Sequence, residues 1–200
     1  MRRHAAVSIL LGPLFLTAAT LGCSHSDGVM NGGNSQVRVM LTDAPSDLIA
    51  SAKVTISRVY LVGDDDASVD LRLASDPPLT FELLDLRNDL QALLADHAVP
   101  ARQYGQLRMV VDAAEVTLVD GATFSDGTHT KALKVPSGMQ SGIKVLLGEP
   151  VTADAGELTI VTVDFDVDDN FVLQGPADAP HGVIFTPVLK EKGRTETPIP

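Results

Sequence analysis

Short runs in which apolar residues alternate with other residues constrain the fold of this chain more than any other feature. In the first run, Val37, Val39 and Leu41 share one face of an extended backbone, because successive side chains of a strand point to opposite sides. Many short runs separated by turn-forming residues predict an all-β domain at residues 37–190, an antiparallel two-sheet sandwich. The other runs are Lys53–Val62, Val69–Leu73, Leu79–Leu84, Gly105–Val111, Glu115–Val119, Ala132–Val135, Ile143–Leu147, Leu158–Val167 and Gly182–Leu189.

The second run changes phase in its middle. Val54 and Ile56 lie on one face of an extended chain. Val59 and Leu61 lie on the other face, so the alternation slips near Ser57-Arg58. A β-bulge, or a strand that passes from one sheet to the other, would produce this slip.

One segment, Leu86–Leu94, has leucines at helical spacing. They recur at steps of three and four residues before Pro100, which favours a short amphipathic helix. We expect this single short helix to cross an open end of the sandwich.

The N-terminal residues have the plan of an export signal. Arg2 and Arg3 precede an apolar run, and small residues lead to Cys23, so residues 1–22 are expected to be a signal peptide. The residues before Cys23 resemble a lipobox, which predicts lipidation of this cysteine. Residues 23–36, rich in Gly, Ser and Asn, are expected to be a flexible tether, and residues 191–200 a flexible tail.

Charge and cysteine content narrow the classes of function. The chain has 26 acidic and 15 basic residues and a net charge of −11, which disfavours nucleic-acid binding because phosphate contacts need clustered Lys and Arg. A single cysteine cannot form an intramolecular disulfide, which leaves Cys23 available for a lipid.

The strongest polar motif is the acidic run that ends the strand at Leu158–Val167. If the strand continues, Asp164, Asp166 and Asp168 lie on one face and repel one another unless a cation compensates them. Calcium is a candidate, although the twelve-residue calcium-loop pattern fails at Asp169 and Gly175. Lys or Arg partners, or simple solvation, are the alternatives, and otherwise no cofactor is expected.

No catalytic motif is present, and we expect a non-enzymatic protein. The turn that contains Ser137 and Ser141 lacks the nucleophile-elbow pattern, and no His pair has metal-ligand spacing. A serine hydrolase that uses this turn with one of three separated histidines remains an alternative, since triads are defined by geometry. The histidines are His97, His129 and His181.

Four motifs in a fixed order resemble the bacterial and archaeal domain-of-unknown-function 4382 family. They are Val39-Met40-Leu41-Thr42-Asp43-Ala44-Pro45, Tyr104-Gly105-Gln106-Leu107-Arg108, Val135-Pro136-Ser137-Gly138 with Ser141-Gly142-Ile143-Lys144, and Val163-Asp164-Phe165-Asp166. The resemblance implies an exported, often lipid-anchored β-sandwich of immunoglobulin-like or transthyretin-like character, with no established activity. Its hallmark positions correspond to Asp43, Ser137, Gly138, Lys144, Asp164 and Asp166.

These positions also have a purely structural interpretation. Gly138 and Gly142 could supply turn geometry, and Lys144 could pair with Asp164 or Asp166 across strands. Asp43 could bond nearby backbone or lie at the edge of a ligand site.

The sequence therefore predicts an exported surface module of the cell envelope, attached to a membrane by a lipid on Cys23. Its role is expected to be binding of a glycan or protein ligand, or structural. A calcium-stabilised domain is the second hypothesis and the serine hydrolase the third. Ser24 is not the Asp associated with retention in the inner membrane, which favours the outer membrane.

Overall fold

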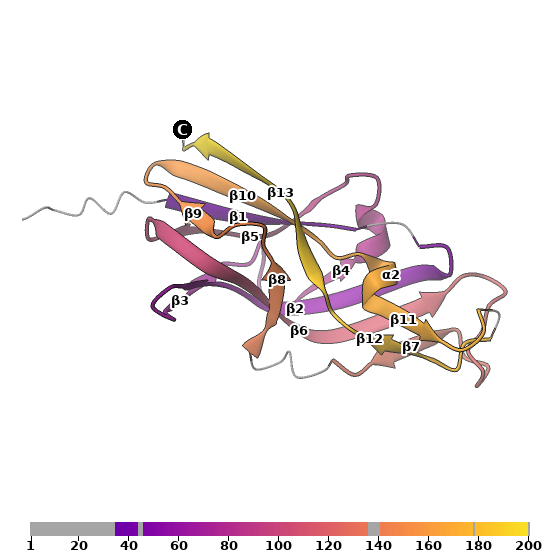
Figure 1. Cartoon of the computed structure of the whole chain (residues 1–200). Helices are drawn as coiled ribbons and strands as arrows, with labels where there is room; N and C mark the ends of the chain where they lie inside the picture. The colour runs from indigo at the N-terminus through magenta and orange to yellow at the C-terminus, as the bar shows by residue number, and fades with distance from the viewer. Residues whose placement is uncertain (1–34, 44–45, 136–140, 178, 200) are drawn as a thin grey trace, which may run out of the picture. The chain divides into compact units, whose positions relative to one another are not determined.

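The alternating runs become strands in the computed structural model, which describes residues 35–43, 46–135, 141–177 and 179–199 (Figure 1). The predicted signal peptide at residues 1–22, Cys23, Ser137 and Gly138 lie outside the described residues. The strands are β1 Ser35–Thr42, β2 Ile49–Gly63, β3 Ser68–Leu71, β4 Leu79–Glu82, β5 Ala92–Val99, β6 Arg102–Leu118, β7 Thr130–Leu133, β8 Ile143–Leu146, β9 Val151–Ala153, β10 Glu157–Asp164, β11 Phe171–Gln174, β12 Gly182–Phe185 and β13 Leu189–Pro198.

The strands are not arranged as an antiparallel two-sheet sandwich, and that prediction is wrong. Within the described ranges, eleven strands form one sheet with the order β3-β2-β6-β8-β13-β10-β1-β5, in which β4, β7 and β9 are side branches. The short strand β8 joins the two halves, because it pairs with β6 on one side and β13 on the other (Figure 1). The sheet is mixed, since β1 runs parallel to β10 and β13 parallel to β8.

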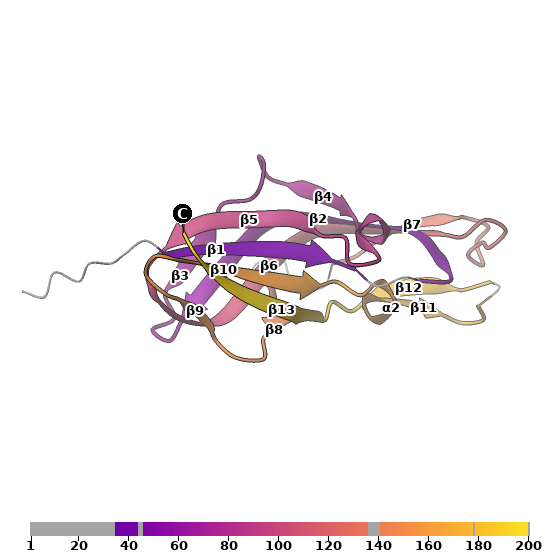
Figure 2. The same cartoon turned by 90° about the horizontal axis from the view of Figure 1, so that it is seen from above.

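The two outer edges of this sheet also meet. Leu73, just after β3, forms a bridge with Ala95 of β5. Ala74 N donates to Leu94 O at 3.0 Å and Asp96 N donates to Arg72 O at 2.9 Å. The sheet therefore curls into a nearly closed ring, and β1 lies between β10 and β5 in it (Figure 2).

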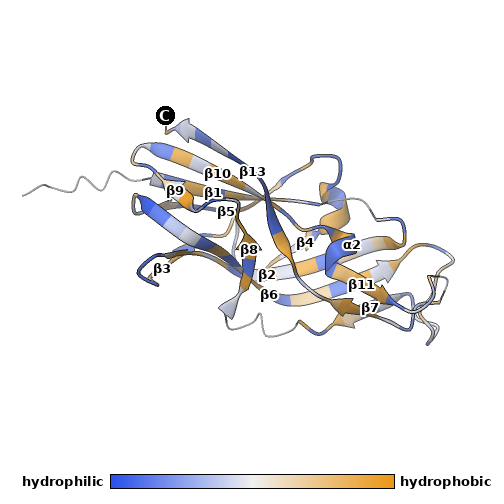
Figure 3. Ribbon diagram, in the orientation of Figure 1, coloured by the Kyte–Doolittle hydropathy of each residue, from blue (hydrophilic) through white to orange (hydrophobic). Residues whose placement is uncertain are grey.

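The core lies inside this ring and is built by the alternation that the sequence shows. Val37, Val39 and Leu41 of β1 are all fully buried. Burial also alternates along β10, where Thr159, Val161 and Val163 are fully buried, and Figure 3 shows hydrophobic and hydrophilic residues interspersed along this strand. Phe165, Phe171 and Phe185 pack with ring centroids 5.1–6.4 Å apart and fix the separate hairpin β11–β12 to the end of β10.

The bulge predicted near Ser57-Arg58 is confirmed. The pairing of β2 with β6 shifts between Ile56 and Arg58, so Ser57 has no partner in that register. The two runs predicted at Gly105–Val111 and Glu115–Val119 form one long strand, β6, whose register with β2 shifts at the same place.

The predicted helix at Leu86–Leu94 is wrong. A 3-10 helix, η1, covers Leu83–Leu86, and the chain then enters β5, which pairs with β1. Leu90 is 60% exposed and Leu93 39% exposed, so the leucines do not form one buried helical face. Pairing with β1 outweighs the local spacing. No helix among the described residues has both the length and the apolar character needed to cross a membrane.

The tail prediction for 191–200 is also wrong as far as residue 198. Leu189–Pro198 is strand β13, paired with the whole of β10. Beyond Leu189 its side chains are mostly exposed, so hydrogen bonds to β10 hold it and hydrophobic burial contributes little. A strand of this kind leaves no apolar pattern in the sequence.

Candidate functional site

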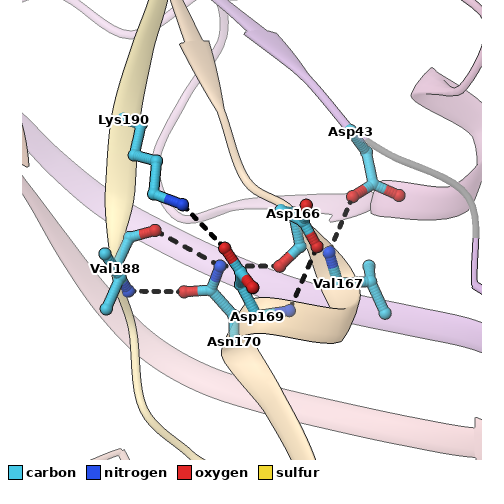
Figure 4. A network of polar contacts seen from close by, with 7 residues as sticks. All are labelled: Asp43, Asp166, Val167, Asp169, Asn170, Val188 and Lys190. Carbon is cyan, nitrogen blue, oxygen red and sulfur yellow. Dashed lines mark hydrogen bonds and ion pairs between the residues drawn. The ribbon is translucent and has the colours of Figure 1, made fainter.

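The parallel pairing of β1 and β10 brings Asp43 beside the acidic run. Thr42 is in register with Asp164, and both strands end there. Phe165 N donates to Thr42 O at 3.0 Å. Asp43 is 2% exposed, and its Oδ1 accepts a hydrogen bond from Val167 N at 3.0 Å (Figure 4). Two motifs that are distant in the sequence thus form one structural unit.

The acidic run does not continue as a strand. A single α-helical turn, α2 Val167–Asn170, follows β10, and Asp166 is its N-cap, accepting from Asp169 N at 3.0 Å. Asp168 is exposed on this turn. The prediction that Asp164, Asp166 and Asp168 share one strand face is therefore wrong.

Asn170 ties this turn to the segment before β13. Its side chain is fully buried; Nδ2 donates to Asp166 O at 2.6 Å and to Val188 O at 3.4 Å, and Oδ1 accepts from Val188 N at 2.6 Å (Figure 4). Sequence reasoning missed this residue. The signal available was the acid at Asp166 followed three residues later by Asp169, which is typical of a helix start.

Lysines of β13 compensate the acidic run. Lys190 Nζ lies 2.7 Å from Asp169 Oδ2, and this hydrogen bond raises the pKa of Lys190. Burial raises the pKa of Asp164, whereas the positive charge of Lys192 opposes the rise. Lys partners are the alternative to calcium that the sequence left open. No three His, Cys, Asp or Glu side chains of the described residues are arranged to hold a metal ion, and calcium stays a prediction.

A second cluster lies on the outer face of β2, β6 and β8. Arg108 of β6 stands directly between Tyr60 of β2 and Lys144 of β8 in the strand register. The carbonyl oxygen of Ser141 accepts from Tyr60 Oη at 2.6 Å and from Arg108 Nη1 at 2.7 Å. Lys144 does not pair with Asp164 or Asp166, contrary to the pairing that the sequence allowed; it is exposed beside Arg108.

Gly142 explains why this second cluster is so tightly built. Its φ is +64°, in the left-handed region that favours glycine. A Cβ there would lie 3.2 Å from Met109 O and 3.2 Å from the Tyr60 ring. The start of β8 can therefore approach β6 and β2 this closely only with glycine at this position.

A cleft of about 530 Å³ opens beside the bulge of β2. On this edge of β2, β3 pairs with Val59–Val62 and β4 with Lys53–Ile56, so the backbone at 57–58 stays uncovered between them. Charged and hydroxyl side chains line the cleft together with a few apolar ones: Ser57, Arg58, Asp70, Arg72, Ser75 and Asp76, with Leu71, Leu73, Ala74 and Pro77.

The described residues do not bring a serine hydroxyl and a histidine together as the hydrolase alternative requires. Ser141 is exposed, and its carbonyl, not its hydroxyl, makes the contacts above. In the described ranges, the hydroxyls of Ser35, Ser51 and Ser57 bond to a backbone carbonyl or a carboxylate, not to histidine.

Comparison with known proteins decides the family. The family described as "Domain of unknown function (DUF4382)" matches residues 34–187, which is most of the chain. The chain belongs to this DUF4382 family. The resemblance found in the sequence motifs is thereby confirmed.

No curated protein matches the chain. MbnP from Methylosinus trichosporium is a similar solved structure, with 14% identity, coverage of 74% of this chain and 82% of that chain, and a TM-score of 0.37, too low to bear on fold or function.

The four motifs of this DUF4382 chain fold as two pairs. The first and fourth meet where β1 and β10 end, through the hydrogen bond from Phe165 N to Thr42 O. The second and the described part of the third meet where β6 pairs with β8, through Arg108 and Ser141. Of the hallmark positions, Asp43, Asp164 and Asp166 thus lie together and Lys144 lies in the other cluster.

Proposed function

We propose that this DUF4382 protein is an exported, lipid-anchored surface module of the cell envelope with a non-enzymatic binding role. Its ligand is a glycan, held in the cleft beside the bulge of β2. The observation that carries the proposal is the uncovered stretch of β2 at 57–58, flanked by β3 and β4 and lined by donors and acceptors. Bulges occur often beside functional sites because they re-aim side chains.

The side chains of the cleft suit a ligand rich in hydroxyl groups. Arg58 and Arg72 offer donors, while Asp70 and Asp76 offer acceptors. A sugar hydroxyl both donates and accepts, so it can use both kinds of group, whereas a strongly charged ligand would be repelled by one of them. The volume of about 530 Å³ is in the usual range of small-molecule sites, about 300–1,000 Å³.

Three further features of the cleft suit it to a glycan. Arg58 Nε donates to Asp70 Oδ1 at 2.6 Å, and its guanidinium lies 4.3 Å from the centre of the Tyr60 ring. Arg72 has no ion pair within the described ranges, so it can bond a ligand without first losing a carboxylate. Leu73, Ala74 and Pro77 supply apolar surface for the C–H faces of a sugar ring.

The test is a titration of the full chain, followed by NMR, with cellotriose, chitotriose, maltotriose and mannotriose. We expect at least one trisaccharide to bind saturably. Arg72→Ala should weaken its binding about tenfold, as expected for loss of one charge-assisted hydrogen bond. Lys134→Ala, which removes another exposed cation that is in none of the described ion pairs, is the matched control and should leave the affinity unchanged. Absence of binding, or equal binding by the Arg72→Ala variant, contradicts the glycan site.

The anchor has a separate test, because its support comes from the signal-like N-terminus and Cys23. We expect metabolic labelling with a radioactive fatty acid to mark the wild-type protein, and Cys23→Ala to abolish the label and release the protein from membranes. Fractionation should place the labelled protein in the outer membrane, in line with Ser24. A labelled Cys23→Ala variant would refute lipidation at this cysteine.

A further inference from the structure

Arg108 and Lys144 form a pair of like charges that the described chain does not compensate. They face each other directly in the antiparallel pairing of β6 with β8. Their neighbours Leu107, Met109 and Ile143 are buried, so both cations point to the outer face of the sheet. Side chains in such opposed positions are about 4.5–5.5 Å apart at Cβ, and like charges there destabilise the sheet.

Acidic side chains of the described residues form ion pairs with other cations and not with this pair. The described ion pairs join carboxylates to other cations and include neither Arg108 nor Lys144. The adjoining segment 136–140 reads Pro-Ser-Gly-Met-Gln and contains no acidic residue. In a chain with a net charge of −11, this pair of facing cations still has no carboxylate partner among the described ion pairs.

Arg108 is held in one orientation. Its Nε donates to Gln106 Oε1 at 2.8 Å and its Nη1 donates to Ser141 O at 2.7 Å. Tyr60 Oη fixes the same carbonyl, and Gly142 lets the backbone approach. Within the described residues Nη2 has no hydrogen bond, so the guanidinium keeps one free donor group. The exposed Lys144 is its neighbour in the strand register.

We propose that Arg108 and Lys144 form a binding site for a phosphate group. An oriented guanidinium supplies directed hydrogen bonds to phosphate oxygens, and an ammonium supplies a mobile point charge. The phosphate neutralises the like-charge pair, so binding removes a repulsion as well as adding contacts. This site adjoins the glycan cleft, because Tyr60 contacts Arg58 of the cleft and lies opposite Arg108 in the strand register. Its two ligand-binding side chains, Arg108 and Lys144, do not line the cleft.

Phosphate of this kind could be a free ion or a lipid headgroup, and the experiment separates them. Full-length protein with Cys23→Ala is titrated with inorganic phosphate while the Arg108 Nε–H signal is followed by NMR. The same protein is mixed with vesicles of phosphatidylcholine alone or with phosphatidylglycerol added. The difference between the two vesicles isolates the charged headgroup from binding by apolar segments.

Lys144→Gln is the decisive variant, because Lys144 is exposed and has no described contact that folding needs. We expect Lys144→Gln to bind phosphate about tenfold more weakly, because it loses one charge-assisted bond. The control Lys134→Gln should bind phosphate as tightly as the wild-type protein. Lys144→Arg should retain binding. If only phosphatidylglycerol vesicles respond to Lys144→Gln, the phosphate is that of a lipid headgroup. Absence of binding in both arms, or binding unaffected by Lys144→Gln, overturns the proposal.

Discussion

At the scale of single residues, the buried polar groups at the ends of β1 and β10 do more for the fold than for chemistry. Asp43 and Asn170 are 2% and 0% exposed, and they accept hydrogen bonds from Val167 N and Val188 N. Both side chains satisfy backbone groups that the end of a strand leaves open. Sequence reasoning could find Asp43 through its motif. It could not find the partner of Asp43, which lies in another part of the chain.

Replacing Asn170 by Ala tests this structural role. Loss of the carboxamide leaves Val188 N without its acceptor, and loss of a typical intramolecular hydrogen bond costs about 0.5–1.5 kcal/mol. We expect the free energy of unfolding from urea titration to fall by at least that amount. Asn170→Asp is the control, since it keeps an acceptor for Val188 N and should lose less. An unchanged free energy of unfolding in Asn170→Ala would show that the turn α2 does not depend on this side chain.

Asp164 gives a prediction about pH. Its Oδ1 has no bond within the described residues, and burial raises its pKa despite Lys190 and Lys192; Asp166 and Asp169 add to the rise. A carboxyl group whose pKa is higher in the folded state favours folding when protonated, so its contribution is lost as pH rises through the folded-state pKa. We expect Asp164→Asn to be more stable than wild type at pH 7, with the gap closing toward pH about 3, below the ordinary Asp pKa of about 3.9. Melting curves across this range measure it, and a pH-independent gap would contradict it.

At the scale of elements, the sequence predicts strands well wherever one face is buried. The run beginning at Val37 and the slip at Ser57-Arg58 both appear in the structure as β1 and the bulge of β2. Prediction fails where the apolar residues of a strand do not alternate in the sequence. Strand β13 is held through its backbone, and the leucines at 86–94 are spaced like a helix although they enter an extended strand.

Removing residues 191–200 distinguishes a strand from a tail. The truncated chain loses most of the pairing between β13 and β10, which runs from Glu157 to Asp164. We expect it to lose cooperative thermal unfolding or to accumulate in the insoluble fraction. Truncation after Pro198 is the control and should behave like wild type. Equal stability of both truncated chains would restore the tail interpretation.

At the scale of the whole domain, the sequence identified a β-rich fold but not how the strands close. The parallel pairing of β1 with β10 and the bridge from Leu73 to Ala95 join segments that are distant in the sequence. No local sequence pattern predicts that these segments are neighbours. The candidate sites depend on these pairings. Asp43 meets Val167, and Arg108 meets Lys144, only because distant strands are neighbours.

Hydrogen exchange tests the closure directly. The amides of Ala74 and Asp96 donate across the meeting edges. We expect them to exchange as slowly as amides of β1, because opening them requires separating two edges of the sheet. Ala67, whose amide donates to the exposed carboxylate of nearby Asp65, is a suitable fast-exchanging reference. Exchange of Ala74 and Asp96 at the rate of Ala67 would mean that the ring stands open at this seam.

The position of β1 has a mechanical consequence. The chain enters this strand at Ser35, and β1 is hydrogen-bonded to β5 on one side and to β10 on the other. These bonds run across the strand, so a pull on the chain along β1 loads both ladders at once and does not peel them open one bond at a time. A domain pulled from this end would therefore resist stretching through both ladders together.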